Sequence, residues 1–150
     1  MNALFEGDLI RPLGLVTLYF GYAEFEVDAL LQVLNGVGSV TRPPRNAPLR
    51  QKLLAAGEQL SRLPVPQASQ LISIIHSARP LIDLRNALIH SCILAKGRVV
   101  PHDKSQPELS ISPEQLNELA EAIWNWKERL NVARQLHLMP ALLNATSHVT

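Results

Sequence analysis

The sequence predicts an all-α fold, an up-and-down bundle of four main helices with a short hairpin-like insertion before the last long helix. Apolar residues recur three and four positions apart over four long segments, which is the spacing of one helix face. Glycines and prolines separate these segments. The 150 residues suffice for a single domain with a sizeable core, which we place at about residues 9 to 138, with 139 to 150 as a short tail.

Residues that favour helix starts and stops bound the predicted segments. Side chains that can cap a helix precede three of the four, and Gly or Pro follows each predicted end. The helices are predicted over about residues 8 to 34, 46 to 63, 67 to 95 and 112 to 138, with Asp8 or Arg11, Asn46 and Ser112 at the capped starts and Pro140 stopping the last.

A short hairpin is predicted between the last two helices. Arg98 to Pro101 and Glu108 to Ile111 are the two arms, and we expect this excursion to be too short to count as a sheet. A strong helix start then follows at Ser112, Pro113 and Gln115. Ser caps the helix, and the Gln side chain three positions later can bond back to the backbone N–H of the cap residue.

The third predicted helix carries a charge where the rest of its face is apolar. A guanidinium in an apolar layer must either be paired or serve a function, because an unpaired buried charge costs several kcal/mol. Pro80 is expected to kink or split this helix, since proline removes one backbone hydrogen bond. The apolar seam consists of Leu71, Ile74, Ala78, Leu81, Leu88 and Cys92, with Arg85 in its middle.

Polar residues form a second row on the same predicted helix. Asn86 and His90 lie one above the other, and Asp83 lies one turn before Asn86. Arg85 and His90 are about 140° apart around the helix axis. The two side chains therefore cannot stack directly, and they line one cleft only if the long Arg side chain swings toward His90.

The stretch Leu84-Arg85-Asn86-Ala87-Leu88-Ile89-His90-Ser91 resembles the signature of the HEPN superfamily, in which an Arg, often followed by a polar residue, precedes a His by four to six positions late in a long helix. The resemblance implies a metal-independent RNA endonuclease of a defence or toxin-antitoxin type, with Arg85, Asn86 and His90 as catalytic residues. It also implies a homodimer in which two copies of the motif meet, and it allows an antitoxin or a nucleotidyltransferase as a further partner.

The roles implied by this resemblance suit the residue types. RNA supplies its own nucleophile, the 2′-hydroxyl, so cleavage needs a base for its proton and a cation for the phosphate. His90 can be the base or acid, because the reference pKa of histidine is about 6.5. The planar guanidinium of Arg85 suits a phosphate, and Asn86 can orient the imidazole or the substrate. The products would be a 2′,3′-cyclic phosphate and a 5′-hydroxyl end.

Acidic residues of the first helix are candidate supports for this site. Gly21 costs about 1 kcal/mol relative to Ala inside a helix, which predicts that another backbone comes close there. Glu24, one turn on, is then placed to reach Arg85, and Asp83 is a second supporting candidate. The alternative is that Glu24 and Asp28 belong to a solvated acidic face.

A second interpretation keeps the fold and removes the catalysis. Arg85 would pair with Glu24 or Asp28 inside the bundle, and Asn86 and His90 would hydrogen-bond to a neighbouring helix. The chain would then be a catalytically silent HEPN-like module that binds a nucleotide, a nucleic acid or a protein. A third interpretation drops the family and leaves a helical adaptor or dimerisation domain.

Net charge gives no general attraction to nucleic acid, because the chain carries only +1. Basic residues nevertheless cluster between positions 42 and 62, where Glu58 is the only acid. This cluster is a candidate phosphate-binding patch, and the alternative is a solvated loop and helix face. The candidate nucleic-acid-binding residues are Arg42, Arg45, Arg50 and Lys52.

Composition bears on the oligomeric state, the location and the cofactors expected for the protein. Hydrophobic residues make up 47% and charged residues 18%, which leaves apolar surface for a second copy to cover, so a homodimer is expected. The lone Cys92 gives no disulfide framework, which favours a reducing, cytoplasmic location. We expect no metal or other cofactor, no signal peptide and no membrane span, because no ligand cluster or long apolar run is present.

Overall fold

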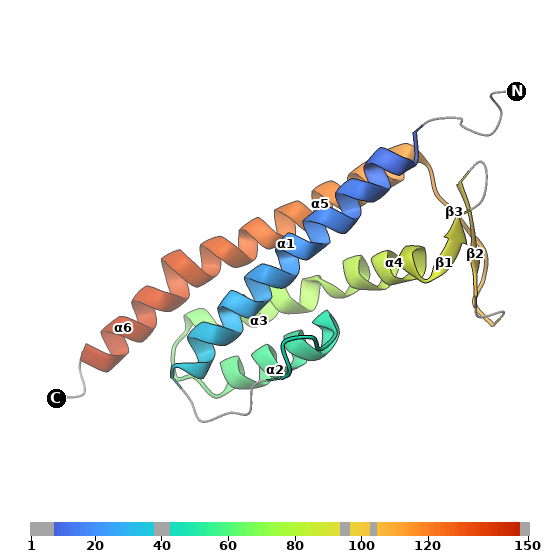
Figure 1. The fold of residues 1–150 in the computed structure, drawn as a ribbon. Coiled ribbons are helices and arrows are strands. Elements are labelled where there is room, and N and C mark those ends of the chain that lie inside the picture. The colour runs from blue at the N-terminus through green and yellow to red at the C-terminus, as the bar shows by residue number, and fades with distance from the viewer. Residues whose placement is uncertain (1–7, 38–42, 94–96, 103–104, 148–150) are drawn as a thin grey trace, which may run out of the picture. The chain divides into compact units, whose positions relative to one another are not determined.

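Helices make up most of the computed structural model of this protein (Figure 1), which confirms the predicted all-α helical bundle. The structure describes residues 8–37, 43–93, 97–102 and 105–147. Its helices are α1 (Ile10–Asn35), α2 (Leu49–Ser61), α3 (Gln67–Ser77), α4 (Arg79–Ile89), α5 (Pro113–Val132) and α6 (Met139–Ser147), with a π-helical segment at Ala133–Leu138, and its strands are β1 (Ser91–Ile93), β2 (Arg98–Pro101) and β3 (Leu109–Ser110).

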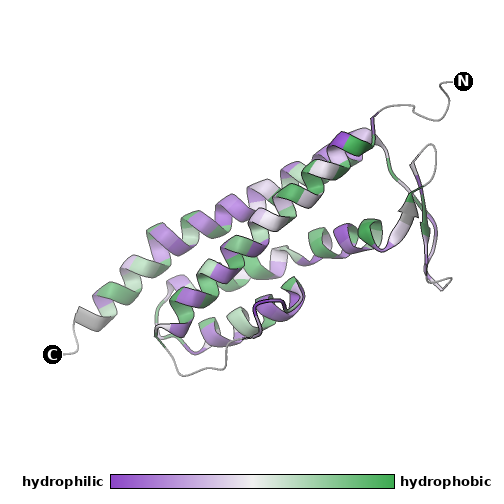
Figure 2. Ribbon diagram, viewed as in Figure 1, coloured by the Kyte–Doolittle hydropathy of each residue, from purple (hydrophilic) through white to green (hydrophobic). Residues whose placement is uncertain are grey.

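The chain divides into two compact units. Residues 1–21 and 80–124 form one, here called the sheet unit, and residues 22–79 and 125–150 form the other, here called the helical unit. Fully buried side chains line the core of each unit, and Figure 2 shows how apolar residues recur along the helices between hydrophilic ones. Those of the sheet unit include Val16, Leu88, Val99 and Leu116, and those of the helical unit include Val27, Leu30, Leu60, Leu71, Leu130 and Leu138.

The start of α1 is confirmed. The Asp8 carboxylate oxygen Oδ1 accepts hydrogen bonds from the backbone N–H groups of Ile10 at 3.0 Å and Arg11 at 3.2 Å. These bonds satisfy donors that a helix start leaves open. The close backbone approach expected at Gly21 is wrong, because a Cβ added there would meet no described atom within 4 Å.

The second helix starts later than predicted. The N–H of Ala47 donates to the carbonyl oxygen of Pro44 at 2.9 Å, which closes a turn ahead of the helix. Asn46 lies in that turn, and α2 begins at Leu49 without a side-chain cap. The prediction that Asn46 caps this helix is therefore wrong, although the helix ends before Pro64 as expected.

The split at Pro80 is confirmed, and the predicted end of that helix is wrong. A break at Ala78 separates α3 from α4, and α4 stops at Ile89 instead of continuing to about residue 95. The next three residues form β1, which pairs antiparallel with β2, so that Ile93 lies opposite Val99. Pairing with β2, which follows β1 closely in the chain, outweighs helix propensity here, and both of these β-branched residues favour strands.

The predicted hairpin is confirmed by the antiparallel pairing of β2 with β3, in which Val99 lies opposite Leu109. The expectation that it would be too short to count as a sheet is wrong, because β1 adds a third strand in the order β1-β2-β3. Gly97 stands just before β2 with a φ of 73°, and its carbonyl oxygen accepts a hydrogen bond from the N–H of Ile111 at 2.8 Å. Glycine adopts this left-handed conformation at little cost.

The start of α5 is confirmed, whereas the predicted end of the last helix is wrong. Ser112 Oγ accepts from the Gln115 N–H at 3.1 Å, and Gln115 Oε1 accepts from the Ser112 N–H at 2.9 Å, which is a capping box. Helical structure continues past Pro140 to Ser147. Proline is tolerated because it falls in the first turn of α6, after the wider π-helical turn in which Met139 N–H donates to the carbonyl of Arg134.

Gln59 of α2 is a buried polar side chain, 5% exposed, whose two amide atoms have no hydrogen-bond partner among the described residues. Such a group costs about 1 to 3 kcal/mol of desolvation. Gln59→Met is therefore expected to raise the free energy of unfolding by about 1 kcal/mol in urea titrations. Gln51→Met, at an exposed position of the same helix, is the matched control and should change it little; a destabilised Gln59→Met protein would contradict this view.

Candidate active site on α4

Arg85 points its guanidinium toward the core of the sheet unit. Its Cζ lies 4.0 Å from the centroid of the Phe20 ring, and Phe20 is itself only 4% exposed. Arg85 Nη1 also donates to Asn86 Oδ1 at 3.1 Å. A cation over a partly desolvated aromatic face is stabilised by the ring quadrupole. The charge in the apolar seam therefore stacks on an aromatic ring and donates a hydrogen bond to an amide, so it has partners, as the sequence predicts.

Asn86 is half-buried, and its side chain contacts Arg85. His90 follows the end of α4 and is exposed. Its backbone N–H donates to the carbonyl oxygen of Asn86 at 3.0 Å, so the last turn of the helix holds the two residues one above the other. The Ser91 hydroxyl donates to the Ala87 carbonyl and reinforces this turn.

The structure thus brings together two of the three predicted catalytic residues. Arg85 and Asn86 are in contact, and His90 lies on the exposed side of the same turn. An angle of about 140° around the helix separates the inward Arg85 from His90. One short segment therefore carries an anchored positive charge and, on another side, an exposed imidazole that can accept a proton.

The supporting residues are placed as follows. Asp83 is exposed on α4, two residues before Arg85. Glu24 is half-buried on α1, and its contact with Arg85 stays a prediction. In the part of the chain that the structure describes, no three His, Cys, Asp or Glu side chains gather to hold a metal ion, and no helix is long and apolar enough to cross a membrane.

Lys52 is not available to bind phosphate, which contradicts the prediction. Its Nζ lies 2.8 Å from Asp28 Oδ1, and its side chain is only 4% exposed. Asp28, 28% exposed, is therefore paired and not simply solvated. Lys52 occupies the buried face of α2 together with Leu49 and Ala56, and its apolar stem packs there while the ammonium reaches the carboxylate. Its spacing of three and four from those residues was the signal that could have revealed this.

The predicted basic patch does not form one surface. Arg45 and Arg50 are exposed, whereas Lys52 is buried, and Arg42 lies outside the described residues. Arg50 and Lys52 are two residues apart on α2, which places them about 160° apart around its axis. Arg50 therefore faces away from the Asp28 side of the helix.

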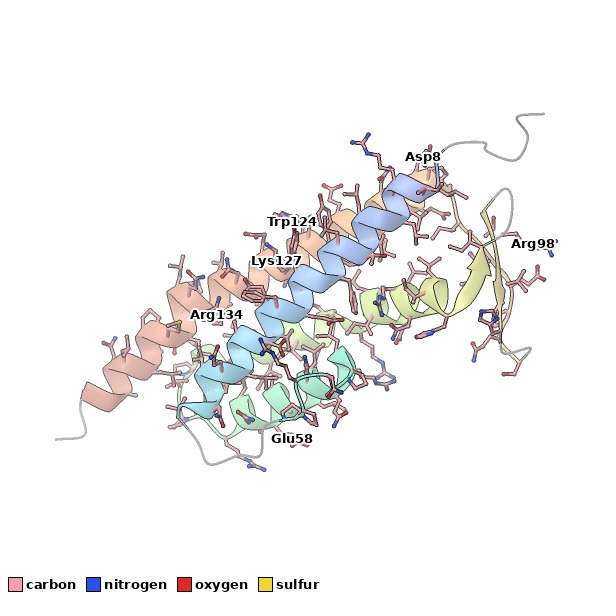
Figure 3. All side chains as sticks on the ribbon, viewed as in Figure 1. Asp8, Glu58, Arg98, Trp124, Lys127 and Arg134 are labelled. Atoms are coloured by element: carbon pink, nitrogen blue, oxygen red, sulfur yellow. The ribbon has the colours of Figure 1, made fainter. Side chains whose placement is uncertain are left out.

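The helical unit contains an ion pair that was not predicted from the sequence. Arg134 Nη2 (labelled in Figure 3) lies 3.2 Å from Glu26 Oε2, and each side chain is 13% exposed. The same nitrogen donates to Asn131 Oδ1 at 3.2 Å. This network ties α1 to the π-helical segment. Nothing local in the sequence signals it, because the two charges are 108 positions apart.

Removing the ammonium of the Lys52–Asp28 pair should leave a carboxylate without its partner in a partly buried position. Lys52→Met is expected to lower the free energy of unfolding by about 1 to 3 kcal/mol, measured by urea unfolding. The double variant Lys52→Met/Asp28→Asn should recover much of the loss, because it removes both charges. Arg50→Met is the matched control at an exposed position; an equal loss there would contradict a specific role of the pair.

α4 also lines an apolar groove of about 380 Å³ within the sheet unit. Leu84, which is 37% exposed, belongs to this groove and directly precedes Arg85. The groove includes Leu81, Leu84, Leu88, Leu109, Ile111 and Leu119.

The chain was compared with protein families, with curated proteins and with solved structures. No family model, no curated protein and no solved structure matches it.

Proposed function

We propose that this chain is a metal-independent RNA endonuclease of the HEPN type, of a defence or toxin-antitoxin system, that acts through Arg85, Asn86 and His90. The observation that carries the proposal is the arrangement on α4: the Arg85 guanidinium donates to Asn86 Oδ1 at 3.1 Å, and His90 is exposed one turn after Asn86. Arg85 would neutralise charge on the scissile phosphate, Asn86 would hold the guanidinium, and His90 would transfer a proton.

The geometry of the motif supports a homodimer as part of this proposal. Arg85 is directed inward from α4 and His90 is exposed just after the end of that helix, so one copy does not aim both groups at one phosphate. A second copy of the motif facing the first would add a second imidazole and a second guanidinium to the cleft. The apolar groove on α4 and Ile89, which is 40% exposed, offer the surface that such a copy would cover.

Two imidazoles complete the proton transfers. One His90 would take the proton of the 2′-hydroxyl while the 2′-oxygen bonds to phosphorus. The other would give a proton to the departing 5′-oxygen, and the P–O5′ bond would break. The products would be a 2′,3′-cyclic phosphate and a 5′-hydroxyl, with no net consumption of protons.

End-group analysis of RNA cut in EDTA tests this chemistry. Fragments from a mixed RNA pool should carry 5′-hydroxyl ends, which polynucleotide kinase labels directly, and cyclic phosphates, which acid opens. A strict requirement for added Mg²⁺ or Mn²⁺, or 5′-phosphate ends, would contradict the mechanism.

A catalytically silent module is the second candidate, and the stacking of Arg85 on Phe20 at 4.0 Å favours it. In that case Arg85 serves the fold, and the exposed apolar side of α4 binds a partner such as an antitoxin or a nucleotidyltransferase. Absence of cleavage across many RNAs, together with a loss of thermal stability in Arg85→Ala, would select this candidate.

A further inference from the structure

A second groove lies in the helical unit, on one face of α1 and the chain after it. Its volume is about 430 Å³, which is within the range of sites that bind small molecules. Its α1 residues are spaced three and four apart and therefore share a face. The lining residues are Phe25, Asp28, Ala29, Gln32, Pro43 and Arg45.

Phe25 is the most conspicuous member of this groove. Its side chain is 71% exposed, although folding normally buries a phenylalanine. An exposed aromatic ring at the wall of a half-polar groove offers a flat face on which a planar group can stack. Stacking of a nucleic-acid base on such a ring contributes about 1 to 3 kcal/mol and tolerates any base.

Charge in the groove favours an anion. Asp28 would repel a phosphate, but its Oδ1 is 2.8 Å from the buried ammonium of Lys52, so the pair is neutral overall. Among the described residues that line the groove, the remaining charge is that of the exposed Arg45. Lys52 cannot itself touch a phosphate, but it neutralises the charge of Asp28 that would otherwise repel one.

Hydrogen-bonding groups lie on the same face. The amide of Gln32, one turn after Asp28, offers both a donor and an acceptor, as the edge of a base requires. The second oxygen of Asp28, a residue 28% exposed, can accept from the amino group of a base. The groove therefore combines a stacking ring, a polar edge and a cation.

We propose that this groove binds a nucleotide unit, with the base stacked on Phe25, its edge against Gln32 and Asp28, and its phosphate at Arg45. A free mononucleotide and a nucleotide within single-stranded RNA share this chemistry. The groove belongs to the helical unit and uses neither Arg85 nor His90, so it binds whether or not the chain cleaves RNA.

Binding is measured with the full chain carrying Arg85→Ala and His90→Ala, so that cleavage cannot remove the ligand and a failed nuclease hypothesis leaves the test intact. Fluorescence anisotropy with a labelled single-stranded RNA of eight nucleotides and calorimetry with the four mononucleotides are the two arms. Phe25→Ala is expected to weaken binding by about 5- to 100-fold, and Phe25→Trp should retain it. Arg45→Ala should weaken binding and lower the salt slope by about one ion.

Matched exposed positions on α2 provide the controls. Leu54→Ala removes an apolar side chain that is 65% exposed, and Arg50→Ala removes an exposed charge that faces away from Asp28; neither should change affinity. Mononucleotide binding that depends on Phe25 establishes a nucleotide pocket, and dependence seen only with the RNA establishes a strand-binding surface. No binding in either arm, or equal effects in Phe25→Ala and Leu54→Ala, would overturn the proposal.

Discussion

Replacing Gly97 by Ala is expected to lower the free energy of unfolding by about 3 kcal/mol or more. The backbone φ of 73° disfavours any side chain, and a Cβ there would lie 1.8 Å from the carbonyl oxygen of Ile111 and 2.9 Å from its carbonyl carbon. Backbone atoms cannot yield as a flexible side chain does, so the Ile111–Gly97 hydrogen bond of 2.8 Å must break or shift. Urea unfolding and the thermal midpoint both report this loss.

Gly14→Ala is the matched control within the same unit. Gly14 is exposed inside α1, and a Cβ there would meet no described atom within 4 Å. This substitution is expected to stabilise the protein by about 0.5 to 1 kcal/mol, since Ala has the higher helix propensity. A Gly97→Ala protein as stable as the wild type would show that the chain before β2 does not hold the conformation described.

His90→Ala is expected to lower the kcat/KM for RNA cleavage by about 10²- to 10⁴-fold, the usual contribution of a general acid or base. His90 is exposed after the end of α4, so the thermal midpoint should stay near that of the wild type. Arg85→Ala should lower both activity and stability, because it removes the proposed phosphate ligand and the stacking on Phe20. Initial rates on one defined RNA, with thermal melts of each variant, separate these effects.

His76→Ala provides the matched loss of an exposed histidine, on α3 and outside the motif, and should leave the rate unchanged. Arg85→Lys keeps the charge but loses the planar fork, so it should recover only part of the activity. Equal rates for the wild type and His90→Ala would show that the His90 imidazole takes no part in the proton transfers.

Local signals in the sequence predicted much of the fold. The Asp8 cap, the capping box of Ser112 with Gln115 and the break near Pro80 each depend on neighbours within a few positions, and all are present. The strand Ser91–Ile93 was missed because the helical spacing of the apolar residues continues through Cys92, and that spacing carries no information about pairing with β2. Strand pairing is set by tertiary context more than by intrinsic preference.

For the candidate site too, local signals were predicted correctly and contacts set by tertiary context were not. The sequence predicted that Arg85 must be paired or used within an apolar layer, and its guanidinium stacks on Phe20, which is buried. Which partner it takes could not be predicted, because Phe20 and Arg85 lie 65 positions apart in the sequence (85 − 20) and no local pattern links them. Lys52 was misassigned for a related reason: its charge suggested the surface, and only its position within the buried face of α2 indicated otherwise.

Cleavage of a mixed RNA pool in EDTA, by the wild type and by the Arg85→Ala/His90→Ala double variant, tests the proposed nuclease most directly. Far-UV circular dichroism and size-exclusion chromatography verify that the variant keeps its fold. Metal-free cutting by the wild type, lost in a folded double variant, is the expected result. Equal cutting by both proteins, or no cutting by the wild type on any RNA, would contradict the assignment of Arg85 and His90 to catalysis.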